Sequence, residues 1–129
     1  MALARLGSVT LDCDDPAALV TFWSRLLGGE ITYSTANVAV VQVGNLLISA
    51  MRVEDYRPPT WPEDKTPKQI HLDLEAADLE AAEAEAVLLG ATVAPNQAAP
   101  EKFRVLFDPA GHPFCLTLPA NLDRIGLRR

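Results

Sequence analysis

Two stretches, SVTLDCDD (residues 8–15) and HLDLEAAD (residues 71–78), decide how this chain of 129 residues folds. Each is a short alternating run, typical of a half-buried strand, and ends in an Asp that precedes a helical pattern. The two helical patterns also close alike, with LLGGEI (residues 26–31) and LLGATV (residues 88–93). This agreement at both ends predicts two copies of one structural unit, the second with a helix one residue shorter.

The first helix has clear start and stop signals. Asp15 is a natural N-cap, Pro16 suits the first helical position, and Gly28 can take the left-handed conformation that ends a helix. Apolar residues between them recur at the helical spacing and form a stripe that can pack on a sheet: Leu19, Phe22, Trp23 and Leu26. The second helix is expected over residues 79–89, with a thinner apolar stripe.

Three strand-like runs follow each helix, so each unit is expected to be β-α-β-β-β, an α+β fold. The first strands are expected over 8–12 and 70–75, and the later ones over 30–34, 38–43, 46–52, 91–94, 103–107 and 113–118. We expect one domain over residues 1–119. It consists of module one (5–52), a proline-rich linker (53–68) and module two (69–119), and a surface tail follows over 120–129.

Composition narrows the classes of function. Seventeen acidic residues against eleven basic ones give a net charge of −6, so the chain lacks the basic footprint of a nucleic-acid binder. Its longest apolar runs are far shorter than the ~20 residues of a membrane span, and its N-terminus lacks the pattern of a signal peptide. Two cysteines are too few for a disulfide scaffold. We expect a cytoplasmic protein whose partner is a small molecule.

Strand parity separates an apolar sheet face, which must meet the helices, from a polar face that holds the candidate chemistry. An exposed polar face is common in antiparallel sheets, but it usually carries Lys or Glu. Small and titratable residues stand here instead, which favours a ligand-binding cup. The polar-face positions are Ser8, Thr10, Asp12, Ser49, Met51, His71, Asp73, Cys115 and Thr117.

The repeat and its motifs resemble the vicinal oxygen chelate superfamily, and most closely its glyoxalase-like domains. The resemblance covers roughly residues 6–119. It rests on Asp15-Pro16 leading to Phe22-Trp23, and on LGG (27–29), QIHLD (69–73), LGAT (89–92) and DPAGHPF (108–114). It implies that the two units form a U-shaped mixed sheet around a cavity, the glyoxalase/bleomycin resistance/dioxygenase fold, in a homodimer.

Enzymes of this superfamily hold a divalent metal at four positions, typically His, Gln or Glu. By resemblance the first falls on Ser8, the third on His71 and the fourth on Cys115, while the second falls on Ser49 or Met51. A hydroxyl or a thioether is a poor ligand for a divalent ion, so we expect no full metal site and no cofactor. A zinc, iron, nickel or manganese ion would need nearby carboxylates in a geometry other than the family's.

His71 and Asp73 are the candidate catalytic pair. Asp73 can orient the imidazole and raise its pKa toward neutrality, which suits proton transfer. The alternative is a His bonded to its neighbour for structural reasons, and we slightly favour function because His71 lies in the expected cavity. Cys115 would be a nucleophile if a His activated it, but a lone cysteine on a strand is more often a small buried residue, which we favour. Cys13 has the opposite parity, so we expect no disulfide.

The linker is long for a connection inside a compact domain. It either covers the cavity as a lid, with Trp61 as an apolar wall, or connects the modules with Trp61 packed outside the sheet. The sequence favours neither.

Three functions are compatible with these observations. We favour a protein that binds a small amphiphilic molecule in the sheet cavity without a full metal site. The alternative is a lyase, isomerase or dioxygenase that uses a divalent metal, or His71 as an acid/base. The third is an interaction module with a vestigial cavity. Metal content and saturable ligand binding distinguish the three.

Overall fold

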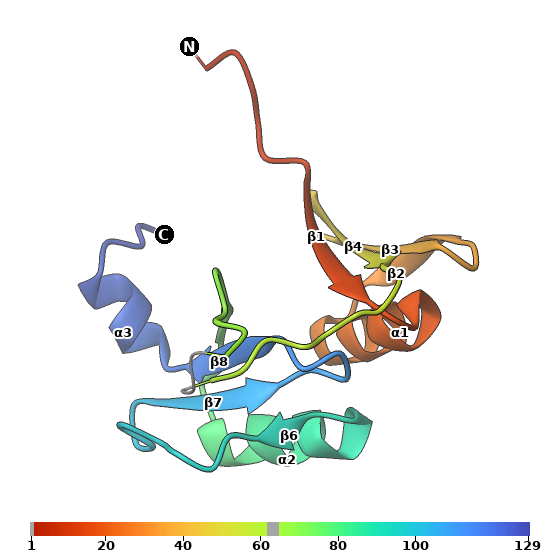
Figure 1. Ribbon diagram of the computed structural model, residues 1–129. Helices are drawn as coiled ribbons and strands as arrows, with labels where there is room; N and C mark the ends of the chain where they lie inside the picture. Colours follow the sequence, from red (N-terminus) through yellow and green to blue (C-terminus); the bar gives the residue numbers. More distant parts are fainter. Residues whose placement is uncertain (1, 62–64) are drawn as a thin grey trace. The chain divides into compact units, whose positions relative to one another are not determined.

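The computed structural model describes residues 2–61 and 65–129, and its internal contacts divide the chain after Pro58 into two compact units. Unit 1 ends at Pro58 and unit 2 begins at Pro59. Each has the element order β-α-β-β-β, with one helix beside its own four-stranded mixed sheet (Figure 1). Pro62 of the predicted linker lies outside the described residues.

Unit 1 is built on a sheet with the strand order β1-β4-β3-β2. Strand β1 pairs in parallel with β4, and the other pairs are antiparallel. Helix α1 packs on β2, β3 and β4 through the apolar stripe read from the sequence, and the Phe22 and Trp23 rings meet edge to face. The elements are β1 (Ser8–Cys13), α1 (Pro16–Leu27), β2 (Glu30–Ser34), β3 (Val38–Val43) and β4 (Leu46–Arg52).

Unit 2 repeats this arrangement with the strand order β5-β8-β7-β6, and β5 pairs in parallel with β8. Helix α2 packs on β6, β7 and β8, and the core beneath it contains Ala86, Leu106 and Phe114, all fully buried. The elements are β5 (Leu72–Glu75), α2 (Leu79–Leu89), β6 (Thr92–Val93), β7 (Phe103–Phe107), β8 (Pro113–Thr117) and α3 (Pro119–Arg124).

The structure confirms the predicted N-caps of α1 and α2 and the predicted glycine at the end of α1. The Asp15 carboxylate accepts a hydrogen bond from the Ala18 N–H at 3.1 Å, and the Asp78 carboxylate accepts one from the Ala81 N–H at 3.0 Å. Gly28 ends α1 at φ 74°, in the left-handed region. Since α1 has 12 residues and α2 has 11, the second helix is one residue shorter, as predicted.

Several boundaries differ from the prediction, and at two of them the difference is one residue: β1 ends at Cys13 and β8 ends at Thr117. Strand β5 begins at Leu72 rather than residue 70, so His71 lies just before the strand. Strand β6 covers only Thr92–Val93, which pair with Phe107 and Leu106 of β7, and one further backbone hydrogen bond, from the Ala94 N–H to the Val105 carbonyl, follows the strand. The predicted surface tail contains a helix, α3, which begins at Pro119. Among the described residues, no helix is long and apolar enough to cross a membrane.

Candidate functional site

The pairing of β5 with β8 brings three reactive side chains together. The parallel register places Asp73 opposite Cys115, and His71 reaches the same point from the residue before β5. Their ligand-capable atoms all lie within 4.8 Å of one another. His71 and Asp73 are exposed at this edge strand, whereas Cys115 is buried in the inner strand.

The contacts within this cluster define the state of each group. The His71 Nε2 lies 3.3 Å from the Asp73 Oδ1, which orients the imidazole. Burial raises the pKa of the Cys115 thiol to about 11, and the charge and hydrogen bonding of Asp73 add to the rise, while the Lys68 ammonium opposes it. The thiol is therefore protonated at neutral pH and is a poor nucleophile.

A cavity of about 410 Å³ opens over this cluster within unit 2. Its volume lies within the usual range for small-molecule sites. Trp61, Phe103, Val105 and Cys115 belong to one packed hydrophobic cluster, so the aromatic rings are held by the core of the unit. The apolar part of the lining consists of Trp61, Phe103, Val105, Pro113, Leu122 and Ile125.

The polar part of the lining comes mostly from outside the sheet. His71 and Asp73 flank the start of β5 and Thr117 ends β8, while the other polar groups lie in the linker, in the loop before β7 and on α3. Sequence reasoning missed these because strand parity says nothing about loops or tails. The polar lining includes Lys68, His71, Asp73, Lys102, Asn121 and Arg124.

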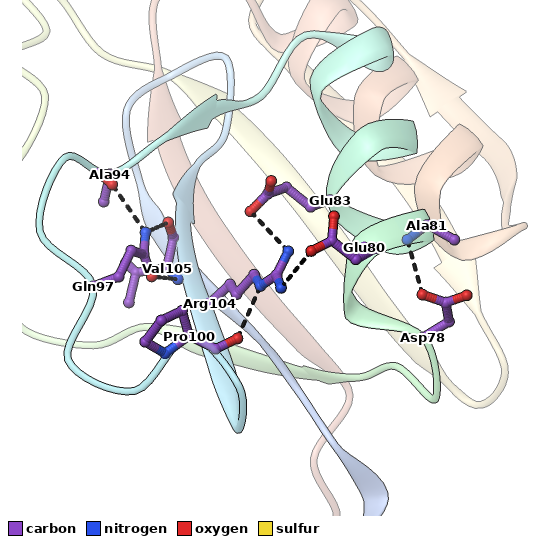
Figure 2. A network of polar contacts seen from close by, with 9 residues as sticks. All are labelled: Asp78, Glu80, Ala81, Glu83, Ala94, Gln97, Pro100, Arg104 and Val105. Carbon is purple, nitrogen blue, oxygen red and sulfur yellow. Dashed lines mark hydrogen bonds and ion pairs between the residues drawn. The ribbon is translucent and has the colours of Figure 1, made fainter.

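Gln97 fixes the loop that leads from β6 to the cavity (Figure 2). Its side-chain amide donates to the carbonyls of Ala94 and Val105, both at 2.9 Å, and its carbonyl oxygen accepts from the Val105 N–H at 2.9 Å. Ala98, the next residue, lines the cavity. Gln97 thus positions one wall of the cavity by satisfying three backbone groups.

Arg104 ties the other side of β7 to α2. It donates to the Pro100 carbonyl at 3.0 Å and lies 2.9 Å from Glu80 and 3.6 Å from Glu83 (Figure 2). The hydrogen bond that the guanidinium donates to the Glu80 carboxylate raises the pKa of the guanidinium. Residue 104 lies between two cavity residues, Phe103 and Val105. The ion pairs of Arg104 therefore hold this part of β7 against α2.

Helix α3 forms a further wall and is fastened at both ends. The Asn121 amide donates to the Lys102 carbonyl at 2.8 Å and to the Thr117 hydroxyl at 3.4 Å. At the chain end, Arg129 pairs with Glu75 and, at 3.0 Å, with Asp123. A proline at the first helical position followed by apolar residues at 122 and 125 was the sequence signal for this helix.

The predicted site residues divide between the two units. Trp61, His71, Asp73, Cys115 and Thr117 all line the cavity of unit 2. The remaining ones lie on one face of the sheet of unit 1, where the Ser8 and Ser49 hydroxyls are 2.9 Å apart and Met51 is exposed. In the strand register Ser49 lies opposite Thr10 and Met51 lies opposite Asp12. The other members of that face are Thr10 and Asp12.

The donor atoms of the two units differ in their suitability for a metal. The paired hydroxyls of Ser8 and Ser49 are neutral and engage each other. His71, Asp73 and Cys115 offer one nitrogen, one oxygen and one sulfur atom. This mixed set of donors suits zinc better than manganese, which prefers oxygen ligands. The neighbouring Lys68 ammonium disfavours a bound cation by like-charge repulsion.

Comparisons with known proteins agree with this architecture. A family model described as "Glyoxalase-like domain" matches residues 8–117. A glyoxalase-related enzyme from Fulvimarina pelagi is 16% identical, with a TM-score of 0.66, over 92% of this chain and 90% of that chain. A search of curated proteins gives no significant match.

Two further solved structures share the fold. One is a variant of the fosfomycin resistance protein FosX from Listeria monocytogenes, in complex with Mn(II) and 1S,2S-dihydroxypropylphosphonic acid. It is 16% identical, with a TM-score of 0.70, over 96% of this chain and 99% of that chain. The other is lactoylglutathione lyase from Agrobacterium tumefaciens, 16% identical with a TM-score of 0.60, over 90% of this chain and 94% of that chain.

Proposed function

The chain belongs to the family of glyoxalase-like domains within the vicinal oxygen chelate superfamily, and from this premise we propose that unit 2 binds a small amphiphilic molecule. The observation that carries the proposal is the cavity of about 410 Å³, with its apolar lining and its few convergent polar groups. This combination is the usual character of a small-molecule site.

The packing of the cavity supports a binding site that is formed before the ligand arrives. Trp61 and Phe103 are anchored against buried residues of β7 and β8, so their rings can take up the apolar part of a ligand without first being ordered. Gln97 and Asn121 hold the adjoining loop and helix through hydrogen bonds to backbone groups. The residues of the cavity wall are therefore already ordered in the folded protein, so ligand binding does not have to order them.

The proposed binding does not depend on the family's four metal positions. By resemblance those positions fall on Ser8, Ser49 or Met51, His71 and Cys115, and a neutral hydroxyl or thioether supplies neither the charge nor the basicity that a divalent ion requires. The pKa of about 11 keeps Cys115 protonated, so at neutral pH the cluster can offer a ligand hydrogen bonds from an imidazole and a thiol.

A library of amphiphilic fragments, screened by two-dimensional ¹H–¹⁵N NMR, tests the proposal. We expect saturable binders whose shift changes include the Trp61 indole and the Asn121 side-chain amide. An Ala98→Phe variant should abolish them, because it places a ring at an exposed position of the cavity wall. Ala120→Phe is the matched control, since Ala120 is exposed on α3 and does not line the cavity.

Failure would be evident in the same experiment. A library without any saturable binder, or binders whose effects persist in the Ala98→Phe variant, would contradict a ligand site in this cavity.

The cluster at β5 and β8 favours a second candidate function, metal-assisted or acid/base catalysis. His71, Asp73 and Cys115 would hold a zinc-like ion, which would act as a Lewis acid toward a ligand oxygen. Without a metal, the His71–Asp73 contact at 3.3 Å suits proton transfer at the imidazole.

Elemental mass spectrometry of tag-free protein separates these functions. About one metal ion per chain, lost in the His71→Ala variant and retained in His112→Ala, would favour the metal-assisted enzyme over the proposed binder. Metal-free protein that still binds fragments would favour the binder.

A further inference from the structure

The charges around the cavity are unbalanced. Lys68, Lys102 and Arg124 contribute three cations to the lining, and Asp73 is the one carboxylate among the described residues that line it. No ion pair joins any of the three cations to another described residue. The cavity is thus locally positive in a chain whose net charge is −6.

The one carboxylate is already engaged. Asp73 lies 3.3 Å from the His71 imidazole on one side and interacts with the Cys115 thiol on the other. These two neighbours occupy part of its acceptor capacity, so Asp73 offsets the three cations of the lining only in part.

The cations also lie on separate elements that surround the apolar lining. Lys68 precedes β5 and is close enough to Cys115 to lower the pKa of its thiol, Lys102 lies just before β7, and Arg124 ends α3. The backbone of Lys102 is fixed by hydrogen bonds to its carbonyl from Leu118 and Asn121. An anionic group that entered the cavity from solvent would therefore be attracted by positive charges on several sides.

From this arrangement, which rests on the proposed binding function, we infer that the ligand is an organic anion with an apolar body. Its ring or chain packs against Trp61 and Phe103, and its anionic group lies among Lys68, Lys102 and Arg124. The local charge outweighs the acidic net charge of the chain, because interactions beyond about 8 Å are screened at physiological ionic strength.

Three matched probes test the inference by isothermal titration calorimetry: 2-naphthoate, the neutral 2-naphthylmethanol and the cationic 2-naphthylmethylammonium. They share one apolar body and differ in charge. We expect 2-naphthoate to bind about tenfold more tightly than the alcohol, and the ammonium to bind most weakly. Added salt should lower the affinity for 2-naphthoate toward that for the alcohol, and it should not lower the affinity for the other two probes.

Charge-removing variants locate the effect. Lys68→Gln, Lys102→Gln and Arg124→Gln should each weaken 2-naphthoate binding about three- to fivefold and change the affinity of the alcohol less than about twofold. Lys65→Gln and Arg128→Gln are the controls, because they remove the same charges from described residues that do not line the cavity. They should leave all three affinities unchanged.

The outcomes separate this inference from the function on which it rests. Equal affinities for acid and alcohol, a preference for the ammonium, or equal effects of the control variants would overturn the inference and leave the binding function standing. If none of the three probes bound the wild-type protein, both would be contradicted.

Discussion

At the scale of single residues, Cys115 decides what chemistry the cavity can support. The resemblance to the superfamily predicts a metal-ligand position here, whereas burial and Asp73 hold the thiol in the protonated form. A protonated thiol is a small, weakly polar surface against which a ligand can pack. The sequence analysis favoured a small buried residue over a nucleophile at this position, and the buried, protonated thiol agrees with that interpretation.

This assignment predicts an unusual pH profile for alkylation of Cys115. With a pKa of about 11, the rate of reaction with iodoacetamide should still rise about tenfold per pH unit between pH 8 and 10, because only the thiolate reacts. Mass spectrometry of the peptide that contains Cys115 measures the rate. Asp73→Asn should lower the pKa and increase the rate at pH 8. A plateau near pH 9 in the wild-type protein would contradict the assignment.

At the scale of elements, the helices that the sequence encodes locally were predictable. An Asp cap at the start and a glycine at the end are enough to define α1 and α2, and both carry these signals. Helix α3 was missed because it has six residues, has no side-chain cap and lies in a charged tail. Its position depends on the contact of Asn121 with Lys102 and on the ion pair of Arg129 with Glu75, and each of these joins residues that are far apart in the sequence.

The caps predict a measurable stability effect. Asp15→Ala and Asp78→Ala should each lower the free energy of unfolding by about 1 kcal/mol, because each leaves a first-turn N–H without its acceptor. Urea denaturation measures both, and Asp14→Ala, beside the first cap, is the control. A loss as large in the control as in Asp15→Ala would refute the capping role.

The loop beside the cavity gives a prediction of its own. Gln97→Met keeps the side-chain length but removes three hydrogen bonds, so we expect a loss of about 1–3 kcal/mol in stability. Affinity for 2-naphthoate should also fall, because Ala98 is no longer held in the wall. Urea denaturation and calorimetry measure the two effects, with Gln69→Met as the control. Unchanged stability and affinity would show that Gln97 has no positioning role.

At the scale of the whole molecule, the repeat and the family were readable from the sequence because their signals recur in order along the chain. The residues that line the cavity could be predicted only in part. Strand parity indicated the groups from β5 and β8, whereas Lys68, Lys102 and Arg124 come from loops and from the unpredicted helix. The net charge of −6 gives no sign of this positive lining, since composition does not reveal where charges gather.

Protection of Cys115 by a ligand tests most directly whether the cavity of unit 2 is a binding site. Iodoacetamide would be applied at pH 9 with and without saturating 2-naphthoate, and each cysteine peptide would be quantified. We expect the probe to slow alkylation of Cys115 saturably and to leave the alkylation of Cys13, a buried thiol of unit 1, unchanged. An unchanged rate at Cys115, with 2-naphthoate and with the neutral alcohol, would contradict it.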